Sequence, residues 1–317
     1  MEFRHVRYFA AVAEERNFTR AAARLNIAQS PLSQQIRQLE REVGVQLFAR
    51  TTRSVALTYA GQVFYQRIAE LLSASEDAID AARKADRGEL GRLAVGFTGS
   101  ATYELLPTLV RAYAGRYPEV TIEVHSDMVT PRQVEELLDG RLGVGILRPP
   151  VTVAGPAVEA IRREPVVVLI ASRHPISVKR EIDLADLRDE WFVAYPNNPP
   201  SPMYTIMESA CKTAGFTPRI RQIVADSAAL VALVAADMGV ALVPASLRHL
   251  RINGATFRPL RSPRITTGLA LAYRESDVNP LVRRFLDVAR TVVRSRNAVE
   301  APTVAPVDDD YRFTLEF

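Results

Sequence analysis

The stretch from Ala28 to Val43 constrains this chain more than any other. Ser30 followed by Pro31 predicts an N-cap with proline at the first helical position, where its missing N–H removes no hydrogen bond. The other faces of this helix carry hydroxyls, carboxamides and arginines. The apolar residues recur at the spacing that places them on one face: Leu32, Ile36, Leu39 and Val43.

The polar faces suit DNA, because hydroxyls and carboxamides match base edges in a major groove and arginines bind bases and phosphates. An ordinary amphipathic surface helix has the same pattern, so this stretch alone leaves both interpretations open. Its neighbours favour DNA binding. Phe3 to Ala13 has helical periodicity, Thr19 can cap a short helix over Arg20–Leu25, and Asn26 can end it.

Two short helices joined by a tight turn predict a helix-turn-helix, with Gly44 ending the second helix. Residues 45–57 then alternate like a short hairpin, which predicts a wing with Arg50 and Arg53 near its tip. These two arginines are expected to reach the DNA backbone or minor groove. Six side chains are expected to face the major groove: Gln29, Ser30, Pro31, Ser33, Gln34 and Arg37.

The distribution of charge agrees with this interpretation. The formal net charge is +4, and residues 1–57, with nine arginines and five glutamates, account for all of it. A polyanion would therefore meet the N-terminal segment. The single cysteine, Cys211, rules out an intramolecular disulfide and indicates a cytoplasmic protein. Neither a signal peptide nor a membrane segment is evident, since charges or prolines interrupt every apolar run.

Several ordered motifs resemble the N-terminal domain of the LysR-type transcriptional regulators. They include Asn17 to Ala22, Leu25 to Ser33, Leu47 to Arg50 and Leu57 to Gly61, and the likeness extends over nearly 300 residues. The resemblance implies an all-α-rich winged helix-turn-helix, a long linker helix and a two-lobed Rossmann-like effector domain like that of periplasmic binding proteins. It also implies double-stranded DNA as a partner, a tetramer built from two dimers and possible contact with RNA polymerase.

Thr58 can cap a long helix that runs to about Asp86. A heptad seam along it predicts antiparallel pairing in a dimer, and the alternative is a helix lying on its own globular body. Arg87 to Gly91 would form a hinge. The seam consists of Phe64, Ile68, Leu71, Ser75, Ala78, Ala82 and Ala85.

From residue 93 onward strands and helices alternate, which predicts an α/β fold with a largely parallel sheet. The expected strands are 93–97, 121–125, 143–147, 166–171, 192–195, 240–244 and 268–273, and the expected helices are 102–115, 131–139, 202–214, 227–237 and 280–295. The predicted domains are thus 1–57 for DNA binding, 58–86 for the linker helix, 87–91 for the hinge and 92–296 for the effector domain, followed by a disordered acidic tail, 297–317. The family resemblance implies lobe I at 92–161 and 268–296, and lobe II at 162–267.

Four helices of this body are expected to begin at a hydroxyl or acidic cap: Ser100, Thr130, Ser201 and Asp226 with Ser227. Helix N-termini at the carboxyl ends of strands can bind anions, although simple capping accounts for any single one. Among LysR-type proteins, the loops at 96–100 and 130–133 resemble the subgroup that controls aromatic-compound catabolism. That likeness implies a small carboxylate effector, either an aromatic acid or a muconate-like dicarboxylate.

Within this likeness, Ser100 and Thr130 would hydrogen-bond the carboxylate, with backbone amides near Pro202 and Met203, while Arg148 would supply positive charge. Arg162 and Asp226 fall where some members form a second acid-binding pocket, and a structural ion pair between them is an equal alternative. Methionine at 203, where relatives often have phenylalanine, leaves the preferred acid open.

Enzymatic interpretations find little support, since the four histidines are scattered and neither a nucleophile elbow nor a phosphate-binding glycine loop is present. No cofactor is expected beyond the effector. Two rival functions remain: a two-lobed solute-binding receptor, which would leave residues 1–57 without a role, and a DNA-binding protein that responds to no ligand.

Overall fold

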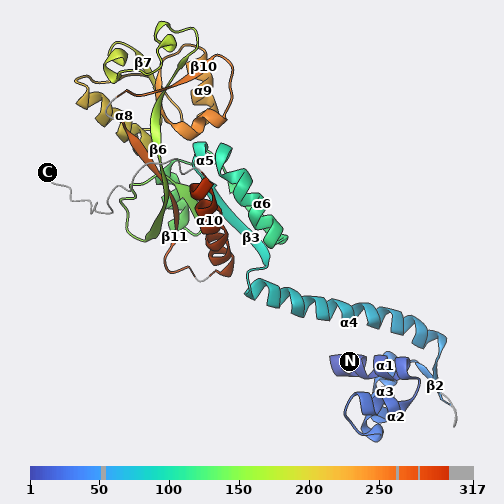
Figure 1. Ribbon diagram of the computed structural model, residues 1–317. Helices are drawn as coiled ribbons and strands as arrows, with labels where there is room; N and C mark the ends of the chain where they lie inside the picture. Colours follow the sequence, from blue (N-terminus) through green and yellow to red (C-terminus); the bar gives the residue numbers. More distant parts are fainter. Residues whose placement is uncertain (51–54, 262–263, 278, 300–317) are drawn as a thin grey trace. The chain divides into compact units, whose positions relative to one another are not determined.

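The computed structural model describes residues 1–50, 55–261, 264–277 and 279–299, and it divides into a first unit, residues 1–84, and a second unit from Ala85 onward (Figure 1). The first unit begins with three helices and a two-stranded antiparallel hairpin. These are α1 (Phe3–Glu15), α2 (Phe18–Arg24), α3 (Gln29–Val43), β1 (Phe48–Arg50) and β2 (Val55–Leu57). The long helix α4 (Tyr59–Asp86) follows.

The core of the first unit forms where the apolar face of α3 meets α1 and the start of α4. Leu32, Ile36 and Leu39 are fully buried, as their spacing predicts, but Val43 is exposed. Phe9 of α1 packs edge-on against Phe64 of α4, with ring centroids 5.0 Å apart. The apolar face of α3 therefore lies at the centre of the core of this small domain, and the polar faces of the helix remain accessible to solvent.

Helix starts in this unit differ from the prediction by one or two residues. Ala28 is the N-cap of α3, so Ser30 and Pro31 lie within the first turn, where a missing N–H still costs no hydrogen bond. Asn17, not Thr19, caps α2: its Oδ1 accepts from the amides of Thr19 and Arg20 at 2.9 and 3.1 Å. Asparagine is the stronger cap.

Two predicted helix boundaries are confirmed by their cap geometry. Gly44 ends α3 with a φ of 82°, a left-handed conformation that favours glycine. Thr58 caps α4, because its hydroxyl accepts from the Gly61 amide at 2.9 Å. Gly61 has no room for a side chain, since a Cβ would overlap the Leu47 carbonyl.

The second unit has two lobes joined by long strands. Lobe I contains β3 (Leu90–Phe97), α5 (Gly99–Glu104), α6 (Leu106–Arg116), β4 (Glu119–His125), α7 (Thr130–Leu138), β5 (Val144–Leu147) and α10 (Pro280–Val299). Strand β3 pairs in parallel with β4 and β5, and Phe97, Leu109, Tyr113 and Phe285 lie in the core of this lobe. Residues 297–299, predicted as the start of the disordered tail, belong to α10, and the rest of the predicted tail, 300–317, lies outside the described residues.

Lobe II is built on the second half of β6 (Pro156–Ala171), which passes from one lobe into the other (Figure 1). Its other elements are β7 (Trp191–Ala194), α8 (Pro202–Thr213), β8 (Arg219–Ile223), α9 (Ser227–Ala235), β9 (Ala241–Pro244) and β10 (Ala255–Pro259). The chain returns to lobe I through β11 (Thr266–Arg274), which runs antiparallel to β6 and to β5. The order of the large sheet is β10-β6-β11-β5-β3-β4, with β9 also paired to β6.

The large sheet is mixed rather than largely parallel, because β9, β10 and β11 all pair antiparallel to their neighbours. Strand β6 begins at Pro156, ten residues before its predicted start. Strands β8 and β10 were not expected, because β8 is mostly exposed and polar and β10 lies at a sheet edge and ends in Pro259. The single helix predicted over 102–115 is divided into α5 and α6, since Pro107 lies in the first turn of α6 and cannot donate to the preceding turn. Among the described residues no helix is long and apolar enough to cross a membrane.

Candidate functional site

The outward side of α3 is the first candidate site. Gln29, Ser30, Pro31, Gln34 and Arg37 are exposed and Ser33 is half-buried, so the six residues predicted to face a major groove lie on accessible surface of the first unit. The side chains of Arg50 and Arg53, predicted for the wing tip, lie outside the described residues.

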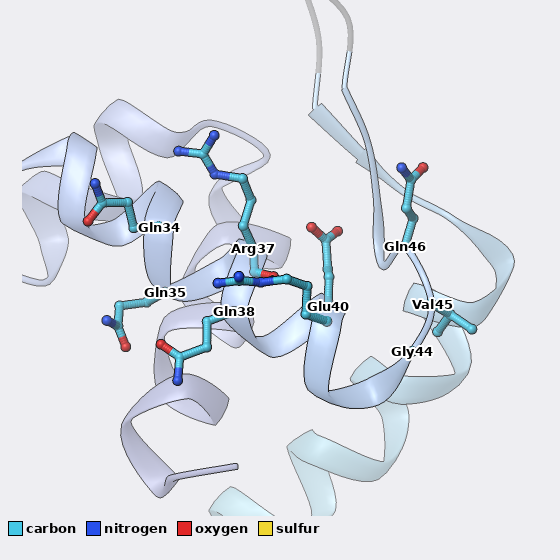
Figure 2. Close-up of a pocket in the computed structure, with 9 residues that line it drawn as sticks. Gln34, Gln35, Arg37, Gln38, Glu40, Gly44, Val45 and Gln46 are labelled. Atoms are coloured by element: carbon cyan, nitrogen blue, oxygen red, sulfur yellow. The ribbon is translucent and has the colours of Figure 1, made fainter.

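A broad groove of about 930 Å³ follows α3 toward the segment after it. Figure 2 shows Arg37 and Gln46 extending from its two walls, with the Glu40 carboxylate between them. Glu40 accepts hydrogen bonds from the amides of Leu47 and Phe48 at 3.0 and 3.1 Å, so it fixes the wing's first strand to α3. Only Gln34 and Arg37 of the groove residues were predicted as site residues. The polar and charged groove residues that were not predicted are Gln35, Gln38, Glu40, Arg41 and Gln46.

Two of the residues that line this groove, Arg37 and Arg41, are positively charged. Several arginines elsewhere are compensated, as with Arg24, which pairs with Glu14 at 2.5 Å. Arg37 and Arg41, by contrast, lie within ion-pair distance of no carboxylate in the part of the chain that the structure describes. Two unneutralised guanidinium groups on an exposed helix are suited to phosphates or guanine edges.

The second candidate site is the cleft between the lobes, where the predicted Arg148 is almost completely buried. Its Nη2 donates to the Ser100 hydroxyl at 2.6 Å and to Glu164 at 2.7 Å, and Nη1 donates to the Gly268 carbonyl at 3.1 Å. The other Glu164 oxygen accepts from the Ser246 amide at 2.7 Å. The positive charge of Arg148 is therefore already balanced by the Glu164 carboxylate, so a ligand in the cleft would not meet an unpaired arginine.

Arg162 forms a two-point ion pair with Glu104 of α5 and lies 3.7 Å from Glu164. The alternative that paired Arg162 with Asp226 is therefore wrong. The Asp226 carboxylate instead caps α9, accepting from the Ala229 amide at 2.6 Å. These two residues lie in different places: Arg162 borders a separate cavity of about 360 Å³, while Asp226 lies at the start of α9.

Two of the four predicted helix caps are confirmed and two are wrong. Ser201 caps α8 through the Tyr204 amide at 3.2 Å, and Asp226 caps α9, as expected. Ser100 lies inside α5, whose N-cap is Thr98, and Thr130 is the first residue of α7. The Thr130 hydroxyl donates to the Arg148 carbonyl at 2.8 Å, so its proton is already used within the protein.

Asp127 is one of the cleft residues that sequence reasoning missed, with Glu164 and Tyr195. It follows β4 at a φ of 53°, and its Oδ1 accepts from the Ser227 amide of lobe II at 3.0 Å. Gly99 packs against this pair of residues, and a Cβ at this position would overlap both the Ser227 hydroxyl and the Asp127 carboxylate. An acid just beyond the carboxyl end of a strand is the signal that could have identified it.

The space left between these groups is small. Ser100, Thr130, Arg148, Pro202 and Met203 line one cavity of about 20 Å³, which is room for about one water molecule. Tyr195 also lines it, and its hydroxyl lies 3.3 Å from that of Ser227. Burial raises the pKa of Tyr195 to about 12, so it remains a hydrogen-bond donor at physiological pH.

Among the described residues, no group of three or more His, Cys, Asp or Glu side chains is placed to hold a metal ion. Cys211 is buried in lobe II, where burial raises the pKa of its thiol to about 12. It is a core residue rather than a nucleophile, as its position on a predicted helix indicated.

Family models match both units of the chain. The family described as "Bacterial regulatory helix-turn-helix protein, lysR family" matches residues 3–62, and the "LysR substrate binding domain" matches residues 86–294. The regulator AlsR of Bacillus subtilis is 40% identical over 289 residues, covering 91% of this chain and 95% of AlsR. BenM of Acinetobacter baylyi is 33% identical, covering 95% of this chain and 99% of BenM.

Solved structures give the same result. CbnR complexed with its target DNA is 31% identical with a TM-score of 0.75, covering 92% of this chain and all of CbnR. Full-length BenM is 32% identical with a TM-score of 0.58, covering 97% of this chain and all of BenM. The predicted combination of a helix-turn-helix with a two-lobed α/β effector domain is thereby confirmed. The chain belongs to the LysR family of bacterial DNA-binding transcriptional regulators.

Proposed function

We propose that α3 reads its operator through Gln29, Ser30, Pro31, Ser33, Gln34 and Arg37, and that Arg50 and Arg53 hold the backbone or minor groove beside it. The observation that carries this proposal is the exposure of the polar side of α3, with the Arg37 charge left uncompensated by the described residues. Two such domains in one assembly require a roughly palindromic site with half-sites about one helical turn apart.

Substitution of Arg37 tests the proposal. Arg37→Ala should weaken operator binding by about 1–3 kcal/mol if the guanidinium contacts a base, and it should relax sequence preference at one position. Arg67→Ala is the matched control, because Arg67 is an exposed arginine on α4 paired with Glu70 at 3.2 Å. An equal loss on operator and random DNA would assign Arg37 to a phosphate instead.

The effector in this proposal is a small carboxylate, an aromatic acid or a muconate-like dicarboxylate, bound between the lobes. Ser100 keeps a hydroxyl proton to donate, because it accepts rather than donates in its bond to Arg148. The Met203 amide in the first turn of α8, beside Pro202, favours an anion. Since the present cavity holds about one water molecule, such an acid requires the lobes to separate. A second acid pocket is proposed at the cavity that Arg162 borders, where Glu104 already pairs with its guanidinium. Asp226, the other candidate for this pocket, caps α9 and does not line that cavity.

Opening gives the ligand a way to act on DNA. A ligand shifts an equilibrium only by the difference in its affinities for the two states, and the closed cleft excludes the acid that the open cleft admits. Pairing of α4 helices in a dimer, and of two dimers in a tetramer, would pass that change to the spacing of the DNA-binding domains. The DNA-bound assembly is proposed to contact RNA polymerase as well.

Titration of the full chain with cis,cis-muconate and with benzoate tests the effector. An acid at one hundred times its Kd should add about 2.7 kcal/mol to the free energy of unfolding. The same acid should change the length of operator DNA that the protein protects or bends. If neither acid, nor a shorter one such as acetate, alters stability or the footprint, the protein binds DNA without this class of ligand.

A further inference from the structure

A second cavity lies between the two lobes, beside the acid cleft, and its volume is about 400 Å³. Lobe I contributes the start of α7 and the loop 150–153, and lobe II contributes the loop 199–202 and Thr205 of α8. The cavity shares Thr130 and Pro202 with the acid cleft but is about twenty times larger. It is therefore much larger than the acid cleft, which both lobes also line.

The walls of this cavity are uncharged. Its lining consists of five prolines, three valines and three threonines. Moving an ion into such surroundings costs several kcal/mol unless a partner is present, so a charged ligand is disfavoured. Two of the three hydroxyls are already engaged, Thr130 with the Arg148 carbonyl and Thr205 with the Ser201 carbonyl at 3.4 Å. Thr152, exposed at the rim, is left for one polar substituent.

The prolines favour a flat ligand. Proline rings and aromatic rings are complementary surfaces, as the docking of proline-rich peptides into aromatic grooves demonstrates, and here the prolines are on the protein side. Their fixed φ angles also keep the walls in place before a ligand arrives, which reduces the ordering cost of binding. A volume of about 400 Å³ lies at the small end of the range for ligand pockets.

We propose that this cavity is a separate binding site for a neutral monocyclic aromatic compound with one hydroxyl group. Its ring packs between Val134 and Pro150 of lobe I and Pro199 and Pro200 of lobe II, and its hydroxyl faces Thr152 at the rim. A ligand held by both lobes stabilises the present lobe arrangement. Acid binding, under the function proposed above, requires the opposite change, so each ligand should weaken the other by the same factor.

Benzyl alcohol is the probe, added to the full chain and followed by ligand-observed NMR. Binding should be saturable, and cyclohexylmethanol, which has the same hydroxyl but a puckered ring, should bind more weakly. Val153→Asp places a carboxylate at the rim and should weaken benzyl alcohol at least tenfold. Val158→Asp is the matched control, since Val158 is 42% exposed against 53% for Val153 and lies on β6 outside the cavity.

Val151→Phe provides a second variant, because it fills the cavity without adding charge and should abolish binding even if Val153→Asp fails to fold. Absence of saturable binding to the wild-type chain would overturn the proposal, as would equal affinity in Val151→Phe. These results are independent of the acid effector, whose titration is read separately. Loss of acid binding with retention of benzyl alcohol would reject the acid cleft and leave this site standing.

Discussion

The Asp127 carboxylate of lobe I accepts a hydrogen bond from the Ser227 amide of lobe II at 3.0 Å. It thereby places a negative charge at the N-terminus of α9, where an incoming carboxylate would otherwise find favourable amides. The Asp127 carboxylate thus occupies a position in the cleft that could otherwise bind an anionic ligand. An acid effector has to displace this contact or bind despite its charge.

Asp127→Asn should therefore increase affinity for an acid effector. Like charges about 4 Å apart repel by about 1–4 kcal/mol between bulk water and a protein surface, so the gain should be at least fivefold. Asparagine tolerates the left-handed conformation at this position and keeps an oxygen for the Ser227 amide. Isothermal titration with the acid measures the effect. Glu208→Gln, an exposed change on α8, is the control, and unchanged affinity in Asp127→Asn would contradict the role assigned to this carboxylate.

The pair of Arg148 and Glu164 should be essential for stability. Glu164→Gln leaves a guanidinium that is 2% exposed without its counter-charge, which should cost about 3–5 kcal/mol of the free energy of unfolding. Glu123→Gln breaks a surface pair with Arg92 and should cost less than about 1 kcal/mol. Urea unfolding of the two variants compares them directly. Equal losses would mean that the buried pair is not the stronger one.

The exposed part of the α4 seam should control oligomerisation. Phe64 and Ile68 pack on the core of their own domain, which leaves Leu71, at 45% exposed, as the first large apolar residue free to meet another helix. Leu71→Asp should reduce the mass measured by light scattering, whereas Val63→Asp, off the seam and 48% exposed, should not. A wild-type mass for Leu71→Asp would show that the seam is not the contact.

Cys211 should be unreactive in the folded chain. Burial raises the pKa of its thiol to about 12, so at pH 8 it should resist a thiol reagent until the protein is unfolded. The folded thiol holds its proton more tightly than the unfolded one. Its contribution to stability is therefore constant below about pH 8.5 and declines as the pH rises toward 12. Rapid labelling of the native chain at pH 8 would contradict this account.

The regular elements were largely predictable, because their signals are local. The burial of Leu32, Ile36 and Leu39 follows from helical spacing, and Gly44 and Thr58 mark boundaries by their own chemistry. Strand β8 escaped prediction because its residues are mostly exposed and therefore carry no burial pattern.

The cleft was predictable only in part, because its chemistry depends on pairs far apart in the sequence. Arg148 was identified by its place after a strand, but its neutralisation by Glu164 depends on where β6 crosses between the lobes. Arg162 was likewise located, but its partner Glu104 lies 58 positions away on α5. Asp127 was missed because its role is a bond to an amide one hundred residues later.

Gly88, in the turn after α4, lies against the start of α10 in lobe I. A Cβ at this position would lie 2.8 Å from the Pro280 carbonyl carbon, and Arg284 of α10 donates to the Arg87 carbonyl at 3.2 Å. The turn that follows α4, which was predicted to be a hinge, is thus packed against α10, the last helix of lobe I. The C-terminal end of α4 is therefore anchored to lobe I through a helix that follows it by almost two hundred residues.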